Sequence, residues 1–190
     1  LDIVRRNVDK SIYKSILSEM NNYMNRGGSF ITLPVDDRVN MVSMLEKYGI
    51  YFDLQSDTLW EQAIRNTSRS LLLQNVINQN YVTVMIDLVH TYGPYIVINQ
   101  DIAIAHAQPT DGANQLGLAM SIYPNGLKIG NHTVRILFVL SAIDQSAHLR
   151  IMKDIISLNE NSETMEKMIN SKSALEALDI IKTIKTEDNM

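Results

Sequence analysis

The chain has 190 residues, the length of one ordinary domain with room for a short appendage. Its formal net charge of −4 at pH 7 gives no general attraction for nucleic acid or for an anionic membrane, so neither is expected as a direct partner. The absence of cysteine excludes disulfides and thiolate chemistry, and no signal peptide or apolar run of roughly 20 residues is present, so we expect a cytoplasmic protein without membrane insertion.

The first 49 residues are predicted to form two helices ahead of the main domain. Apolar side chains recur at about every fourth position of residues 2–25, which is typical of an amphipathic helix. A second helix is expected after Asp36 and Asp37, which can cap it, and Gly49 closes it. We interpret residues 1–49 as a helical extension or the tail of a preceding domain, and 50–190 as the main domain. The chain begins without methionine, which also predicts a longer parent polypeptide.

The main domain is predicted to contain helices, then strands, then helices again. Two helices are expected between residues 57 and 92, the second starting at about Asn78 and ending near Gly93. The predicted strands are 95–98, 102–105, 116–123 and 134–143. The last of these is almost continuously apolar, which is typical of a central strand covered on both faces. Three further helices are expected at 146–158, 162–170 and 173–185. This order predicts an α/β fold, with a sheet between helical layers.

Four histidines are the candidates for chemistry near neutral pH, because imidazole changes charge there without perturbation. His90 lies late in a predicted helix, where a cation interacts favourably with the helix dipole, and His132 lies in a polar turn and is expected to be solvated. His106 directly follows the strand 102–105 and has small neighbours. His148 lies in the first turns of the helix after the central strand, at the carboxyl edge where open α/β sheets build their sites.

Two histidines brought together at that edge can act as a phosphate acceptor and its charge partner. Arg150 and the amides of a helix N-terminus can hold phosphate oxygens nearby. The alternatives are two unrelated histidines or a metal site, although the sequence has no H-x-x-x-H spacing.

The stretch "GPYIVINQDIAIAHAQPTDG" (93–112) resembles the phosphorylation-site region of enzyme IIA domains of the sugar phosphotransferase system. It is similar to the type-2 (mannitol/fructose-like) family and within it to the ascorbate-like branch. The resemblance continues upstream through "WEQAIRNTSRSLLLQNVINQNYVTVMID" (60–87) and downstream through "VRILFVLSAIDQSAHLRIM" (134–152), and it covers about residues 50–185.

This resemblance implies a phosphoryl carrier without cofactor or metal. His106 matches the histidine that accepts phosphate from the carrier protein HPr and passes it to a IIB protein or domain. His148 matches the second active-site histidine, and Arg150 and Ala107 are the candidate phosphate-binding residues. The implied fold is a mixed β-sheet, here of about five strands, flanked by helices on both faces, with the N-terminal helical extension in addition.

The sequence departs from the family pattern at two positions beside His106. Ala105 stands where a proline is usual, and Gln108 stands where an arginine is usual. The helical leader also resembles the region before the IIA-like domain of antiterminator-like (BglG-type) transcriptional regulators. Two alternatives to the carrier therefore stay open: a phosphorylation-sensing domain with regulatory domains upstream in the same chain, or a degenerate IIA-like domain. The leader is equally consistent with a homodimer.

Overall fold

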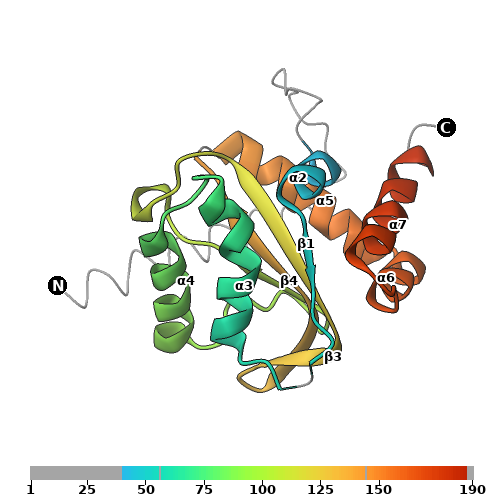
Figure 1. Ribbon diagram of the computed structural model, residues 1–190, viewed down its shortest axis with the longest axis horizontal. Coiled ribbons are helices and arrows are strands. Elements are labelled where there is room, and N and C mark those ends of the chain that lie inside the picture. The colour runs from blue at the N-terminus through green and yellow to red at the C-terminus, as the bar shows by residue number, and fades with distance from the viewer. Residues whose placement is uncertain (1–39, 56, 144, 188–190) are drawn as a thin grey trace, which may run out of the picture. The chain divides into compact units, whose positions relative to one another are not determined.

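The computed structural model describes residues 40–55, 57–143 and 145–187, without the side chains of 145–150 and 184–187 (Figure 1). The predicted helix at residues 2–25 lies outside the described residues. The elements, labelled as in Figure 1, are α2 (Met41–Tyr48), β1 (Ile50–Phe52), α3 (Trp60–Leu73), α4 (Gln79–Tyr92), β2 (Ile102–Ala105), the 3-10 turn η1 (Pro109–Asp111), β3 (Gly117–Ile129), β4 (His132–Ser141), α5 (Gln145–Glu160), α6 (Ser162–Ile169) and α7 (Ala174–Glu187).

The described strands form one mixed sheet in the order β1-β3-β4-β2. β1 is parallel to β3, β2 is parallel to β4, and β3 and β4 pair antiparallel at the centre. The predicted α/β fold with a mixed sheet is therefore confirmed, with four strands in the described part instead of about five. Each position of β4 from Ile136 to Ser141 is buried, as the prediction of a central strand requires.

One predicted strand is wrong, and one observed strand was not predicted. Residues 95–98 form only an isolated bridge between Val97 and Ala103, because the chain turns back within a few residues and Asn99 accepts hydrogen bonds from the backbone of Asp101 and Ile102. The edge strand β1 was not predicted, since three residues are too few to show an alternating pattern.

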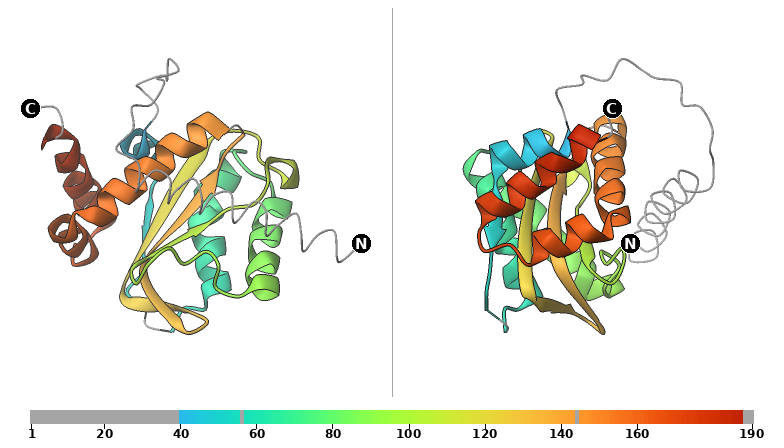
Figure 2. Two further views of the ribbon diagram at one scale, coloured as in Figure 1. Left: turned by 180° about the vertical axis from the view of Figure 1, so that it is seen from behind. Right: turned by 90° about the vertical axis from the view of Figure 1, so that its right-hand side faces the viewer.

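Helices cover both faces of the sheet, as Figures 1 and 2 show. Leu137 and Val139 belong to the apolar cluster that α3 and α4 form on one face. Phe138 between them is also fully buried, and because successive strand side chains point to opposite faces it packs on the side of α5. Figure 2 shows α5, α6 and α7 on that second side.

Side-chain caps fix the beginnings of α4 and α2. α4 begins next to Asn78 and ends at Gly93, as predicted; the Asn78 side chain accepts a hydrogen bond from the Tyr81 amide, and Gly93 has a φ of 77°. α2 is capped by Asn40, whose side chain accepts from the Ser43 amide, instead of by Asp36 or Asp37. This helix packs on β3, and the Met41 amide donates to the Asp154 carboxylate of α5 at 2.8 Å.

None of the helices in the described ranges combines the length and the apolar character that crossing a bilayer requires.

Candidate functional site

The site lies at the edge of the sheet where β2 and β4 end. The two strands are parallel neighbours, with Ala105 paired to Val139, so their carboxyl ends meet at the same edge. His106 follows β2 directly, and α5 begins at Gln145, shortly after β4 ends at Ser141. His148 and Arg150 lie in the first turns of α5, although their side chains are outside the described part. The topology thus brings the backbone of the predicted site residues to one edge of the sheet.

The His106 ring is half-buried and its backbone neighbours are small. Its Nδ1 lies 3.4 Å from the carbonyl oxygen of Ile104. A proton on Nδ1 that is donated to this oxygen leaves the lone pair on Nε2.

The segment after His106 folds into the tight turn η1. The Gln108 amide donates to the Asp111 carboxylate at 3.0 Å, and the Asp111 amide donates to the Gln108 carbonyl oxygen at 2.9 Å. The beginning of α4 holds this turn: the Asn80 side chain donates to the Asp111 carbonyl oxygen, and the Asn78 amide donates to that of Gly112. The loop beside His106 is therefore fixed to a helix that is distant in sequence.

Tyr81 makes the most direct contact between α4 and the site. Its side chain is completely buried, and its hydroxyl oxygen accepts a hydrogen bond from the Ala107 amide at 3.1 Å. The hydroxyl proton has two carbonyl oxygens within reach, that of Leu140 at 2.8 Å and that of Ala107 at 3.1 Å, and the shorter distance favours Leu140. Burial raises the pKa of Tyr81 to about 12, so the hydroxyl keeps its proton at neutral pH. The sequence predicts a helix at this position but gives no sign that Tyr81 contacts the loop after His106.

A comparison with known families identifies the domain. The model of the family described as "Phosphoenolpyruvate-dependent sugar phosphotransferase system, EIIA 2" matches residues 43–184. The chain belongs to this family. The resemblance to type-2 enzyme IIA domains seen in the sequence is thereby confirmed.

Several relatives of this EIIA domain have known sequences or structures. The mannitol-specific cryptic phosphotransferase enzyme IIA component of Escherichia coli (strain K12) is 30% identical over 124 residues, which cover 64% of this chain and 84% of the relative. The ascorbate-specific PTS system EIIA component of the same strain is 26% identical over 143 residues, which cover 73% and 92%.

Solved structures share the fold. The solution structure of the mannitol-specific cryptic enzyme IIA of Escherichia coli superimposes with a TM-score of 0.64 at 26% identity, covering 73% of this chain and 97% of that chain. A complex of the mannitol enzyme IIA with phosphorylated enzyme IIB from Escherichia coli gives a TM-score of 0.59 at 19% identity, covering 70% and 94%, which shows that the fold is shared.

The other two histidines of the EIIA domain lie away from the His106 edge. His90 is near the C-terminal end of α4, whereas the N-terminal end of this helix holds the site. Its ring packs against Trp60 with centroids 4.9 Å apart, and its Nε2 lies 3.5 Å from the Glu61 carboxylate. His132 is exposed at the beginning of β4, the opposite end from Ser141. Among the described residues, no group of three His, Asp or Glu side chains is arranged to hold a metal ion.

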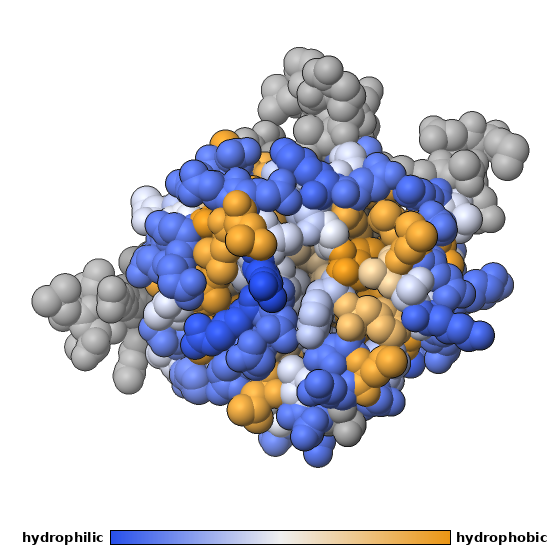
Figure 3. Space-filling view, in the orientation of Figure 1, coloured by the Kyte–Doolittle hydropathy of each residue, from blue (hydrophilic) through white to orange (hydrophobic). Residues whose placement is uncertain are grey.

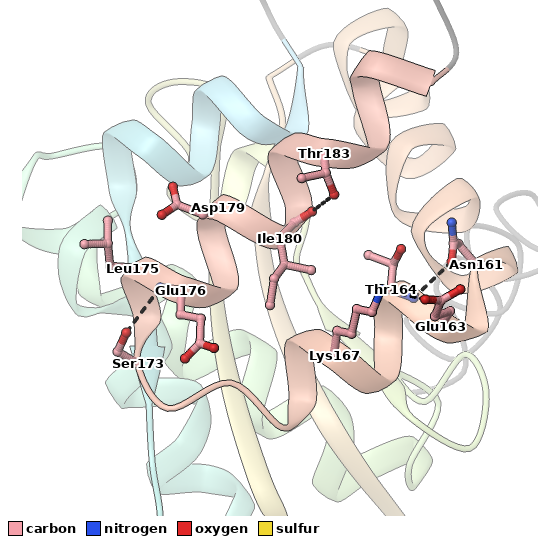
Figure 4. Close-up of a pocket in the computed structure, with 10 residues that line it drawn as sticks. All are labelled: Asn161, Glu163, Thr164, Lys167, Ser173, Leu175, Glu176, Asp179, Ile180 and Thr183. Carbon is pink, nitrogen blue, oxygen red and sulfur yellow. Dashed lines mark hydrogen bonds and ion pairs between the residues drawn. The ribbon is translucent and has the colours of Figure 1, made fainter.

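A groove between α6 and α7 contains none of the predicted site residues. Figure 4 shows its lining, in which Glu163, Glu176 and Asp179 give an acidic character and Lys167 is paired with Glu163. On the face drawn in Figure 3, exposed apolar side chains form small separate groups among hydrophilic ones. Neither feature identifies a ligand or a partner.

Proposed function

We propose that this EIIA domain is a phosphoryl carrier that accepts phosphate on His106 from phosphorylated HPr and passes it to a IIB domain. The observation that carries the proposal is the position of His106 directly after β2, at the edge where β4 ends and α5 begins, in a member of the type-2 EIIA family. The complex of the mannitol enzyme IIA with phosphorylated enzyme IIB supports a IIB domain as the acceptor.

The proposed reaction uses Nε2 of His106 as the nucleophile. With its proton on Nδ1 and donated to the Ile104 carbonyl oxygen, the ring presents the Nε2 lone pair to phosphorus. The Nε2–P bond forms while the bond between phosphorus and the donor breaks, and the reverse exchange delivers the phosphoryl group to the acceptor. Positioning and charge stabilisation account for most of catalysis in such a transfer.

We assign different roles to the other predicted site residues. His148 and Arg150 are proposed to contact the phosphoryl oxygens from α5. The Ala107 amide already donates to Tyr81, so its proposed contribution is a small side chain that leaves the ring accessible. We also propose that the domain includes α2, which packs on β3 and precedes the boundary suggested at residue 50. The regulatory alternative gains no support from the relatives compared above, which are named as phosphotransferase enzyme IIA or PTS system EIIA components.

Phosphorylation of purified variants tests the assignment of His106. Incubation with phosphoenolpyruvate, enzyme I and HPr is expected to give acid-labile phosphate on the wild-type chain and on His132→Ala, but none on His106→Ala. His132 is the matched control because it is an exposed histidine at the far end of β4. Loss of label in His132→Ala would contradict the assignment, and absence of label in the wild type would identify a degenerate domain. Transfer of the label to a mannitol-type or ascorbate-type IIB protein then tests the acceptor.

A further inference from the structure

Tyr81 is a buried residue whose polar contacts have no part in the proposed reaction. It lies 26 positions from Ala107 and 59 from Leu140 along the chain, yet its hydroxyl is within hydrogen-bond distance of both. Ala107 is the residue after His106, and Leu140 lies on β4 one position beyond the partner of Ala105. One hydroxyl group therefore connects the backbone just after β2 with the C-terminal end of β4, and these two strands precede the two predicted histidines.

We propose that Tyr81 is a positioning residue that fixes the backbone after His106 and so aims the imidazole for phosphoryl transfer. This inference rests on the proposed function of His106. The backbone before His106 is held in the β2–β4 ladder through Ala105, and the backbone after it is held by Tyr81. With both neighbours tied, His106 has little freedom to move relative to an incoming phosphoryl group.

The hydroxyl, rather than the ring, is the part of Tyr81 that performs this function. Its oxygen accepts from the Ala107 amide and its proton goes to a strand carbonyl, so the two bonds need both a donor and an acceptor. Ala105 does not fix its own φ as a proline would, so contacts from outside the strand contribute to the order of the loop that follows it.

The substitution Tyr81→Phe removes the hydroxyl and keeps the ring. Tyr123→Phe is a matched control, because Tyr123 is also completely buried in the cluster under α3. Its hydroxyl lies near those of Thr67 and Ser121, away from the His106 loop, and no partner at normal hydrogen-bond distance occurs within the described ranges. Both variants lose one buried hydroxyl from the same core.

Steady-state transfer from phospho-HPr to the full 190-residue chain separates positioning from stability. Tyr81→Phe is expected to lower kcat about tenfold with KM for phospho-HPr changed by less than about twofold, since the ring is misdirected after the partner has bound. Tyr123→Phe is expected to keep both parameters. An unchanged kcat in Tyr81→Phe, or an equal fall in both variants, would overturn the proposal.

Amide exchange in the unphosphorylated chain tests the same inference without any transfer. Exchange of the Ala107 amide is expected to accelerate about tenfold in Tyr81→Phe and to stay unchanged in Tyr123→Phe. If the wild type accepts no phosphate, the proposed function of His106 fails while this measurement still decides whether Tyr81 orders the loop. An Ala107 amide that exchanges equally in all three proteins would refute the role of Tyr81.

Discussion

Tyr81 and Tyr123 are both fully buried, and burial raises the pKa of each from 10.0 to about 12. The raised pKa of each tyrosine makes the free energy of unfolding depend on pH in the same direction. Below pH 10, each tyrosine makes its full contribution to the free energy of unfolding, because it is protonated in the folded and the unfolded chain alike. Above pH 10 the unfolded chain loses these protons while the folded chain keeps them, so the contribution is lost as the pH rises toward 12.

We therefore predict that the free energy of unfolding falls between pH 10 and pH 12, by roughly 2 kcal/mol for each of the two tyrosines. Denaturant titrations at several pH values measure this fall, and Tyr123→Phe should show a smaller one than the wild type. A wild-type and a Tyr123→Phe curve that run parallel from pH 9 to 12 would show that Tyr123 ionises equally in both states.

At the scale of elements, the sequence predicted those with a clear local pattern. β2 was predicted with its observed bounds because it is a short apolar run between polar residues, and α4 because Asn78 and Gly93 mark its ends. β3 continues to Ile129 instead of ending at residue 123, because the chain passes Pro124 through a register shift between Ile122 and Leu127 and then pairs with β4 again.

For the candidate site too, the sequence predicts only what a local pattern specifies. His106 could be proposed from its flanking residues, because the pattern that points to it is continuous in sequence. The contacts of Tyr81 with Ala107 and Leu140 depend on how α4 packs on the sheet, and no local pattern specifies that packing.

The loop between η1 and β3 depends on Gly112. Its φ is 126°, and a Cβ at this position would lie 2.0 Å from the Asn78 side-chain oxygen. Gly112→Ala must therefore adopt a strained backbone and also displace the side chain that caps α4.

We predict that Gly112→Ala destabilises the domain by about 2–3 kcal/mol, as a strained φ and a lost cap together imply. Gly49→Ala is the control, because Gly49 also has a positive φ of 89° but a Cβ added there would meet no atom within 4 Å. Thermal unfolding of the two variants measures the difference. Equal losses in both would mean that backbone strain alone matters and that the Asn78 contact does not.

At the scale of the described domain, one charged network joins the sheet to the C-terminal helices. Arg135 of β4 donates to the Asp101 carboxylate at 2.7 Å and to the Glu166 carboxylate of α6 at 2.7 Å. The Asp101 carbonyl oxygen also accepts from the amides of Arg135 and Ile136. Because Asp101 directly precedes β2, the network links the beginning of this strand with β4 and α6.

The ion pair with Arg135 lowers the pKa of Glu166 from 4.5, although this carboxylate is exposed. A depressed pKa means that the stabilisation is present above pH 4.5 and is lost as the pH falls through the folded-state value. We predict that Glu166→Gln lowers the melting temperature at neutral pH and that the difference from the wild type disappears in acid and shrinks in high salt. Glu163→Gln is the control: Glu163 is paired only with Lys167 of the same helix in the described part, so its loss leaves the link between α6 and β4 intact and should have a smaller effect. A Glu166→Gln difference that persists unchanged at low pH would show that packing of α6, and not the charge on Glu166, joins this helix to the sheet.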